Sequence, residues 1–163
     1  MSSAKLDFRM LIGVISDTHG LLRPEALDAL RGCELILHAG DVGRKEVLEQ
    51  LQAIAPVTAV RGNVDHERWS QQLPKTEIVA AGGAAIYVLH NLEELDLRPD
   101  AAGFSAVVCG HSHRPRIEEK NGVIYFNPGS AGPRRFKLPV SVGRLVVEDG
   151  RIRAEIVELK ITA

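Results

Sequence analysis

The chain has 163 residues, of which 45% are hydrophobic, and its 20 basic and 21 acidic side chains nearly cancel. This length suits one compact domain with its own core, so we expect a single domain over residues 1–163, of which residues 1–9 could form a disordered arm. The net charge of −1 marks no polyanion-binding surface, so no stable nucleic-acid complex is expected. Neither cysteine has zinc or redox spacing, and no signal or membrane segment stands out, which favours a cytoplasmic protein.

The first half of the chain alternates strand patterns with helix patterns. Apolar, β-prone runs predict three strands, at residues 11–16, 35–38 and 57–60. A helix is predicted from Arg23 to Gly32, because proline suits the first turn of a helix and glycine its end. Apolar positions at helical spacing predict a second helix over 45–54. This alternation indicates a parallel sheet with helical crossovers.

The second half is rich in hairpin signals. Short turns that contain glycine join three pairs of strand patterns, which are 77–81 with 84–89, 116–119 with 123–126, and 140–147 with 152–159. Another buried strand is predicted at 106–109, after a turn near 99–103. The second half of the chain is therefore expected to be mostly antiparallel β, and we expect an α/β fold in which two sheets pack together with helices outside.

Five short polar segments of metal-ligand type adjoin these strand patterns. They are Asp17-Thr18-His19, Gly40-Asp41, Gly62-Asn63, His90 and Gly110-His111-Ser112-His113. Strand ends are where an α/β domain gathers distant residues into one site. Each pair, Asp17 with His19 and His111 with His113, is two residues apart, so extended backbone would point its members the same way. Taken singly, each segment suits an ordinary turn as well as a ligand, and His38 and His66 are assigned to packing and to an exposed loop.

Taken together, the segments supply two aspartates, one asparagine and four histidines, enough donors for two divalent metals. Mixed carboxylate, imidazole and amide donors suit Mn, Fe, Zn or Ni better than the all-oxygen sites of calcium or magnesium. Two such ions against two carboxylates leave a surplus of about two positive charges, which favours a bound hydroxide and an anionic phosphate. The residues therefore point towards phosphoester hydrolysis.

The ordered series resembles that of the calcineurin-like metallophosphoesterases, and in particular their small single-domain, YfcE-like phosphodiesterase branch. The matching motifs are Asp17-x-His19, Gly40-Asp41, Gly62-Asn63-x-Asp65, His90, Gly110-His111-x-His113 and Asn127-Pro128-Gly129-Ser130. The resemblance covers about residues 11–147 and implies a four-layer α/β/β/α sandwich of two mixed β-sheets. It also implies a ligand set in which one metal takes Asp17, His19 and His113, the other takes Asn63, His90 and His111, and Asp41 bridges them.

What the resemblance implies about activity is a metal-dependent phosphodiesterase, a hydrolase that acts on ester bonds through a hydroxide activated by two metal ions. Manganese is favoured, with nickel, iron or zinc as alternatives. Asp41, Asn63 and His90 would act through the metals, while Asn63, Asn127 and Arg134 are the expected contacts to a small phosphodiester or nucleotide-type substrate. No membrane partner is expected, and homo-oligomerisation is left open. The alternatives are a phosphomonoesterase or nucleotide hydrolase on the same centre, and a scaffold like the retromer subunit of this fold.

The chain departs from the family pattern beside two of the expected ligands. Many members carry histidine directly after the asparagine, where it can protonate the leaving group, but this chain has Val64. General acid assistance is typically worth about 10²–10⁴-fold, and valine cannot give it, so we expect modest rates or a preference for good leaving groups. Many relatives also read His-Gly-His where this chain has His90-Asn91-Leu92, so only the first histidine is kept.

Overall fold

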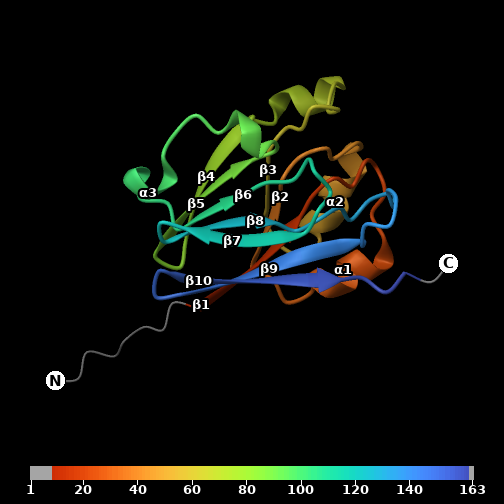
Figure 1. Cartoon of the computed structure of the whole chain (residues 1–163). Helices are drawn as coiled ribbons and strands as arrows, with labels where there is room; N and C mark the ends of the chain where they lie inside the picture. The colour runs from red at the N-terminus through yellow and green to blue at the C-terminus, as the bar shows by residue number, and fades with distance from the viewer. Residues whose placement is uncertain (1–8, 162–163) are drawn as a thin grey trace.

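The computed structural model describes residues 9–161 of the chain. Most of the expected N-terminal arm, residues 1–8, lies outside the described residues, and Arg9 is already the first residue of a strand. The described chain forms two five-stranded sheets that stack face to face, with the longer helices beside one of them (Figure 1). This arrangement confirms the expected α/β fold with two mixed sheets.

The first sheet has the strand order β10-β9-β1-β2-β3. Its strands are β1 (Arg9–Ile15), β2 (Leu35–His38), β3 (Val57–Ala59), β9 (Ser141–Glu148) and β10 (Arg151–Glu158). The strands β1, β2 and β3 run parallel, because the helices α1 (Pro24–Leu30) and α2 (Lys45–Gln52) carry the chain back between them. The hairpin of β9 and β10 joins this sheet antiparallel to β1, which confirms the predicted turn before Arg151.

The second sheet has the strand order β4-β5-β6-β8-β7. Its strands are β4 (Thr76–Ala81), β5 (Ala84–Leu89), β6 (Ala106–Val108), β7 (Arg116–Lys120) and β8 (Val123–Asn127). The two predicted hairpins, β4 with β5 and β7 with β8, are present. Between them, β6 pairs parallel with both β5 and β8, so the centre of this sheet is parallel rather than a run of hairpins.

Three short helical segments complete the fold. Two are 3₁₀ turns, η1 (Arg68–Gln72) and η2 (Leu92–Glu94), which the sequence patterns did not predict, and the third is α3 (Pro99–Ala102) at the expected turn. Segments η2 and α3 cross the outer face of the second sheet, where Leu92 and Phe104 pack on Tyr87. This cover is the thin fourth layer of the sandwich.

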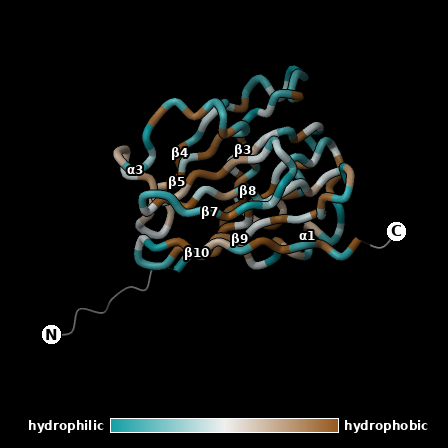
Figure 2. The backbone as a smooth tube through the Cα atoms, in the orientation of Figure 1, coloured by the Kyte–Doolittle hydropathy of each residue, from teal (hydrophilic) through white to brown (hydrophobic). Residues whose placement is uncertain are grey.

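Hydrophobic side chains fill the space between the layers. The central core lies between the two sheets and includes Ile12, Leu37, Ile86 and Phe126, all fully buried. A second cluster packs α1 and α2 onto the first sheet. In Figure 2 the hydrophobic segments accordingly follow the strands of both sheets. Burial on this scale holds the strands in fixed register and makes their ends rigid platforms for side chains.

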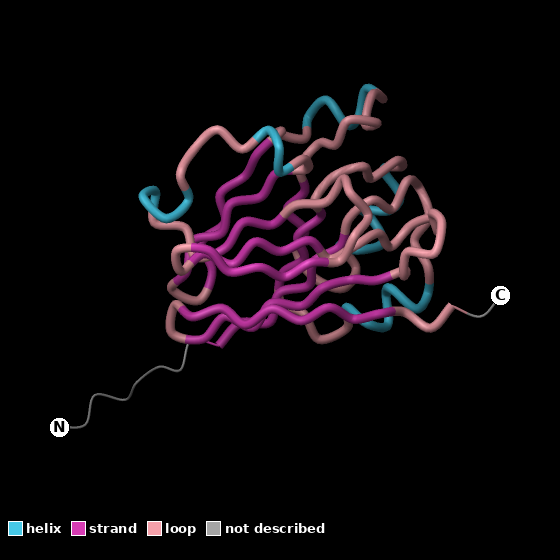
Figure 3. Tube along the Cα trace, in the orientation of Figure 1, coloured by secondary structure: helices cyan, strands magenta, loops and turns pink. Residues whose placement is uncertain are grey.

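All five polar segments follow the carboxyl ends of parallel strands. Asp17, Asp41 and Asn63 come after β1, β2 and β3, while His90 and the His111–His113 segment come after β5 and β6. Figure 3 shows loops gathered beyond the strand ends on one side of the molecule. Both sheets therefore deliver their expected ligands to the same edge, as the sequence predicted.

Candidate metal centre

The backbone leaves extended geometry before the first expected ligand. Five of these residues adopt left-handed conformations with φ between 47° and 71°, and they are Asp17, His19, Asp41, His111 and His113. The expectation that Asp17 and His19 share a direction through extended backbone was therefore wrong, and so was the same argument for His111 and His113. Such conformations are uncommon outside glycine and cluster at functional sites, where the surrounding structure holds them in place.

Hydrogen bonds between loops hold these coiled segments together. The backbone N–H of Asp17 donates to the carbonyl of Gly40 at 3.0 Å, and that of His19 donates to the carbonyl of Asp41 at 2.9 Å. The buried Asp65 carboxylate accepts from the backbone N–H groups of Val42, Gly43 and Gly62, at 3.2, 3.1 and 2.9 Å. Asp65 thereby ties the loop after β2 to the loop after β3.

Glycines permit the close approach of the loops. A Cβ atom on Gly62 would lie 2.1 Å from Asp41 Oδ1, and one on Gly110 would lie 2.0 Å from Ser16 Oγ. Neither distance is possible for real atoms, so any side chain at these positions would push the loops apart. The glycines that precede Asn63 and His111 in the sequence motifs are thus required by the packing of the site.

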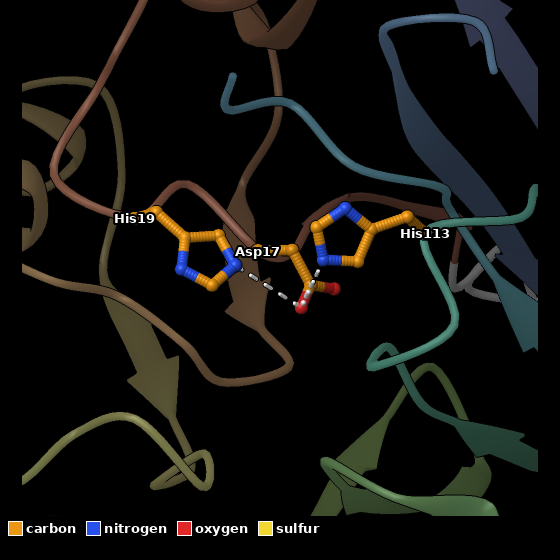
Figure 4. A group of neighbouring side chains, drawn as sticks. All are labelled: Asp17, His19 and His113. Carbon is orange, nitrogen blue, oxygen red and sulfur yellow. Dashed lines mark ion pairs between the residues drawn. The ribbon is translucent and has the colours of Figure 1, made fainter. Parts of the chain in front are cut away.

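Asp17 lies at the centre of one group of donors (Figure 4). Its Oδ1 atom is 3.3 Å from His113 Nε2 and 3.8 Å from His19 Nε2. Its Oδ2 atom accepts hydrogen bonds from Ser16 Oγ and from the backbone N–H of His111. Because Oδ2 is fixed by these donors, Oδ1 is left facing the two imidazoles.

Asp41 lies at the centre of the adjoining group. Its Oδ2 atom is 3.2 Å from His90 Nε2 and 3.7 Å from His19 Nε2, while its Oδ1 atom accepts from the Val64 N–H. The amide oxygen of Asn63 lies 2.9 Å from His90 Nε2 and 3.1 Å from His111 Nδ1. The structure therefore brings all seven expected ligands into one cluster.

The electrostatics of the cluster couple its carboxylates to its imidazoles. Burial alone would raise the pKa of Asp41, but the hydrogen bond and charge of His90 bring this pKa down to about 2. Burial likewise opposes ionisation of Asp17, yet the nearby His113 imidazole, 3.3 Å from Oδ1, and the charge of His90 lower the pKa of Asp17. In return, although burial disfavours a charged His90, its bond to Asp41 and the charge of Asp17 raise its pKa.

A second shell of contacts orients these ligands. His90 donates its Nδ1–H to the Ala39 carbonyl at 2.8 Å, which turns Nε2 towards the carboxylates. His38, fully buried, accepts from the Gly40 N–H at Nδ1 and contacts Thr18 Oγ1 through Nε2 at 3.0 Å. Burial lowers the pKa of His38 to about 4, so it stays neutral. The packing assignment of His38 is confirmed, and its hydrogen bonds additionally connect the first two ligand loops.

The cluster suits a divalent metal centre, because some of its potential metal-ligand atoms have no hydrogen-bond partner. Among the described residues, five buried side-chain atoms have no hydrogen-bond partner, and three of the five belong to the cluster, namely Asp17 Oδ1, His19 Nε2 and His113 Nδ1. Each such atom costs roughly 1–3 kcal/mol unless something binds it. Two groups have donor atoms within 4.8 Å of one another, namely Asp17 with His19 and His113, and Asp17 with Asp41 and His90. Cations held there would meet the first two of these atoms and offset the buried negative charge.

The expected substrate contacts differ in their surroundings. Asn127 is buried and donates from Nδ2 to the Gly110 carbonyl and to Ser112 Oγ, so it braces the loop of His111. Arg134 is exposed on the loop after Gly132. Val64, directly after Asn63, is 42% exposed and donates its backbone N–H to Asp41 Oδ1.

Comparison with known proteins gives consistent matches over most of the chain. The calcineurin-like phosphoesterase superfamily domain matches residues 10–150. A probable metallophosphoesterase of Methanothermobacter thermautotrophicus is 35% identical over 160 residues, which cover 91% of this chain and 92% of that protein. Phosphodiesterase YfcE of Escherichia coli is 28% identical over 160 residues, covering 80% of this chain and 84% of YfcE.

A solved structure gives the same architecture. Vps29 of Entamoeba histolytica, complexed with zinc, superposes with a TM-score of 0.69 at 25% identity, covering 93% of this chain and 100% of that one. Separately, none of the helices within residues 9–161 combines the length and the apolar character that crossing a membrane requires.

Proposed function

Because this chain belongs to the calcineurin-like phosphoesterase superfamily, we propose that it is a metal-dependent phosphodiesterase acting on small phosphodiesters. The observation that carries this proposal is the single cluster of seven oxygen and nitrogen donors, drawn from five strand ends, with unpartnered atoms at its centre. The likeness to phosphodiesterase YfcE supports the choice of a diester. Divalent metal binding follows from the family and from the donor set.

We assign the donors to two metal ions. Asp17, His19 and His113 would hold the first, while Asn63, His90 and His111 would hold the second. Asp41 would bridge them, which its Oδ2 supports by lying near both His19 and His90. Manganese is the proposed native ion, with nickel, iron or zinc as alternatives, since these donors suit all four.

The protein's own groups would position the ester. Two divalent cations bound here would supply a water of lowered pKa and positive charge against the phosphate oxygens. The Asn63 amide oxygen faces His90 and His111, so its Nδ2 is available to donate to a phosphate oxygen. Val64, not histidine, directly follows Asn63, so the leaving group would depart without a histidine acid at that position. This absence favours diesters with acidic leaving groups.

Four further properties of the protein are predictions. They are direct substrate contact by Asn127 and Arg134, a single domain over residues 1–163, a cytoplasmic location and the oligomeric state. Substrate contact by Arg134 would need its loop to approach the phosphate, whereas Asn127 would act through the backbone of the Gly110 loop.

The proposal can be tested with protein stripped of metal and reconstituted with Mn²⁺ or Ni²⁺. Each sample is offered an aryl phosphodiester and the matching aryl phosphomonoester. We expect metal-dependent hydrolysis with the diester preferred. A preference for the monoester would favour the phosphomonoesterase alternative. Failure to hydrolyse either ester, with metal shown to be bound, would favour the scaffold alternative.

A further inference from the structure

Two pockets flank the donor cluster. One has a volume of about 400 Å³, and we call it the basic pocket. Its lining residues are Arg61, Gly62, Asn63, Asp65, His66, Gln71, Lys75, His90, Asn91 and Glu94. The other, of about 540 Å³, is lined by His111 and by Tyr125, which packs in the cluster on the outer face of the second sheet. Asn91 lines both pockets. A phosphorus centre at Asn63, His90 and His111 would therefore have one pocket on each side.

The fold brings two cations together in the basic pocket. Arg61 and Lys75 are distant in sequence, but the backbone N–H of Arg61 donates to the Pro74 carbonyl at 2.8 Å, which places Lys75 beside it. The Arg61 guanidinium donates to Gln71 Oε1 at 2.7 Å and is thereby oriented from η1. Gln71 in turn donates to the His66 carbonyl, which fixes the rim of the pocket.

These cations lack acidic partners within the part of the chain that is described. Within the described residues no carboxylate forms an ion pair with Arg61 or Lys75. In the other pocket Arg116 and Lys120 both pair with Glu118, and of the cations described there Arg114 alone has no ion pair. The acidic residues of the basic pocket are Asp65, whose carboxylate is taken up by backbone N–H groups, and the exposed Glu94. Arg61 and Lys75, which form no ion pair and line a pocket, are therefore suited to bind an anionic ligand.

We propose that the basic pocket binds an anionic group, such as a second phosphate, on one arm of the phosphodiester substrate. Arg61 and Lys75 make the contact, and the scissile phosphate lies at Asn63 and His90, on the same pocket wall. The other ester arm extends towards the pocket over Tyr125. This assignment rests on the proposed phosphodiesterase function and narrows its substrate class to diesters with one anionic arm.

The test uses two p-nitrophenyl phosphodiesters whose alkyl arm ends either in a phosphate or in a methyl group. The metal-loaded wild type should prefer the phosphate-ended ester by about tenfold or more in kcat/KM, as for a pair of charge-assisted contacts. The double variant Arg61→Gln/Lys75→Gln should bring this ratio close to one. Glu94→Gln should raise the ratio, because it removes the one exposed carboxylate of the pocket.

A charge-matched control is Arg151→Gln/Arg153→Gln on the exposed face of β10, which should keep the wild-type ratio. A wild-type ratio near one, or an undiminished ratio in Arg61→Gln/Lys75→Gln, would overturn the proposal. Calorimetric binding of the matching pair of non-hydrolysable phosphonates gives the same ratio without turnover. It thus separates failure of anion recognition from failure of the phosphodiesterase function itself.

Discussion

Residue 64 lies beside the proposed metal centre, at a position where a side chain could reach a leaving group. The Val64 N–H is bonded to Asp41 Oδ1 at 3.0 Å, and its side chain is 42% exposed at the rim of the cluster. A longer side chain at this position would reach solvent-accessible space beside Asn63 rather than the hydrophobic core. The site can therefore accept a proton donor here without repacking.

Val64→His should speed the hydrolysis of diesters with poor, alkyl leaving groups by about 10²-fold, the lower end of general acid assistance. Diesters with a p-nitrophenyl leaving group, which needs little protonation, should change far less. The measurement is kcat/KM against leaving-group pKa, and Val64→Leu serves as the control of similar size. Equal gains for good and poor leaving groups would speak against a missing acid at this position.

Asp41→Ala should abolish turnover of the aryl diester while the protein stays folded. Its carboxylate faces both His19 and His90, so its loss removes the proposed bridge between the two metals. Activity and circular dichroism are measured together, with Asp96→Ala on an exposed loop as the control. Wild-type turnover in Asp41→Ala would rule out the bridging role.

The loops between elements, more than the elements themselves, build the site. Asp65 accepts three backbone N–H groups from two loops, and His38 connects β2 to the loops of Asp17 and Asp41. Neither residue is proposed to touch metal or substrate. Their contribution is to hold left-handed residues in place, and it should be measurable as stability and metal affinity.

Asp65→Asn should weaken Mn²⁺ binding by roughly 10-fold, the low end of the effect of losing outer-shell support, because Asp65 holds the backbone next to Asp41 and Asn63 rather than a ligand side chain. The amide replaces one acceptor oxygen by a donor, which opposes the N–H groups of Val42, Gly43 and Gly62. Calorimetric titration measures the affinity, and Asp149→Asn in the β9–β10 turn is the control. An unchanged affinity in Asp65→Asn would show that the loops hold their shape without this carboxylate.

The lowered pKa of His38 predicts that the stability of the metal-free protein depends on pH. Folding lowers its pKa from 6.5 to about 4, so between these values only the unfolded chain takes up the proton. The free energy of unfolding therefore has its full value, as far as His38 is concerned, above about pH 6.5. It decreases as the pH falls towards 4, by roughly 3 kcal/mol at most. Urea unfolding of the wild type and His38→Gln should show a steeper loss in the wild type. Parallel pH profiles would contradict this assignment.

The sequence predicted the elements better than the loops. Strand β5 begins and ends where the strand pattern of residues 84–89, next to the Gly82-Gly83 turn, placed it, because buried strands carry their pattern in consecutive side chains. The left-handed backbone at Asp17 and His19 could not be predicted, since it is imposed by hydrogen bonds from distant loops. The turn η1 was missed for a similar reason, because its polar residues carry no periodicity and its position depends on packing.

The candidate centre also joins the two halves of the molecule. Four of its proposed ligands follow strands of the first sheet, and the three histidines His90, His111 and His113 follow strands of the second. Metal bound here would link the sheets at their carboxyl edge, in addition to the hydrophobic core between them. Stability should therefore depend on metal concentration.

Saturating Mn²⁺ should raise the melting temperature of metal-free protein, since a ligand at 100 times its Kd stabilises the folded state by about 2.7 kcal/mol per site. The rise should shrink in His90→Ala and in His113→Ala, which each remove one ligand from the second sheet. Scanning calorimetry with and without Mn²⁺ gives the shift. An identical shift in these variants and the wild type would place the stabilising ion elsewhere.

The seven proposed ligands should form one centre for two metal ions. The number of Mn²⁺ ions bound per chain at saturation is measured by equilibrium dialysis with elemental analysis. We predict two ions per wild-type chain. A wild-type chain that binds none, or that saturates at a single ion, would overturn the two-metal assignment.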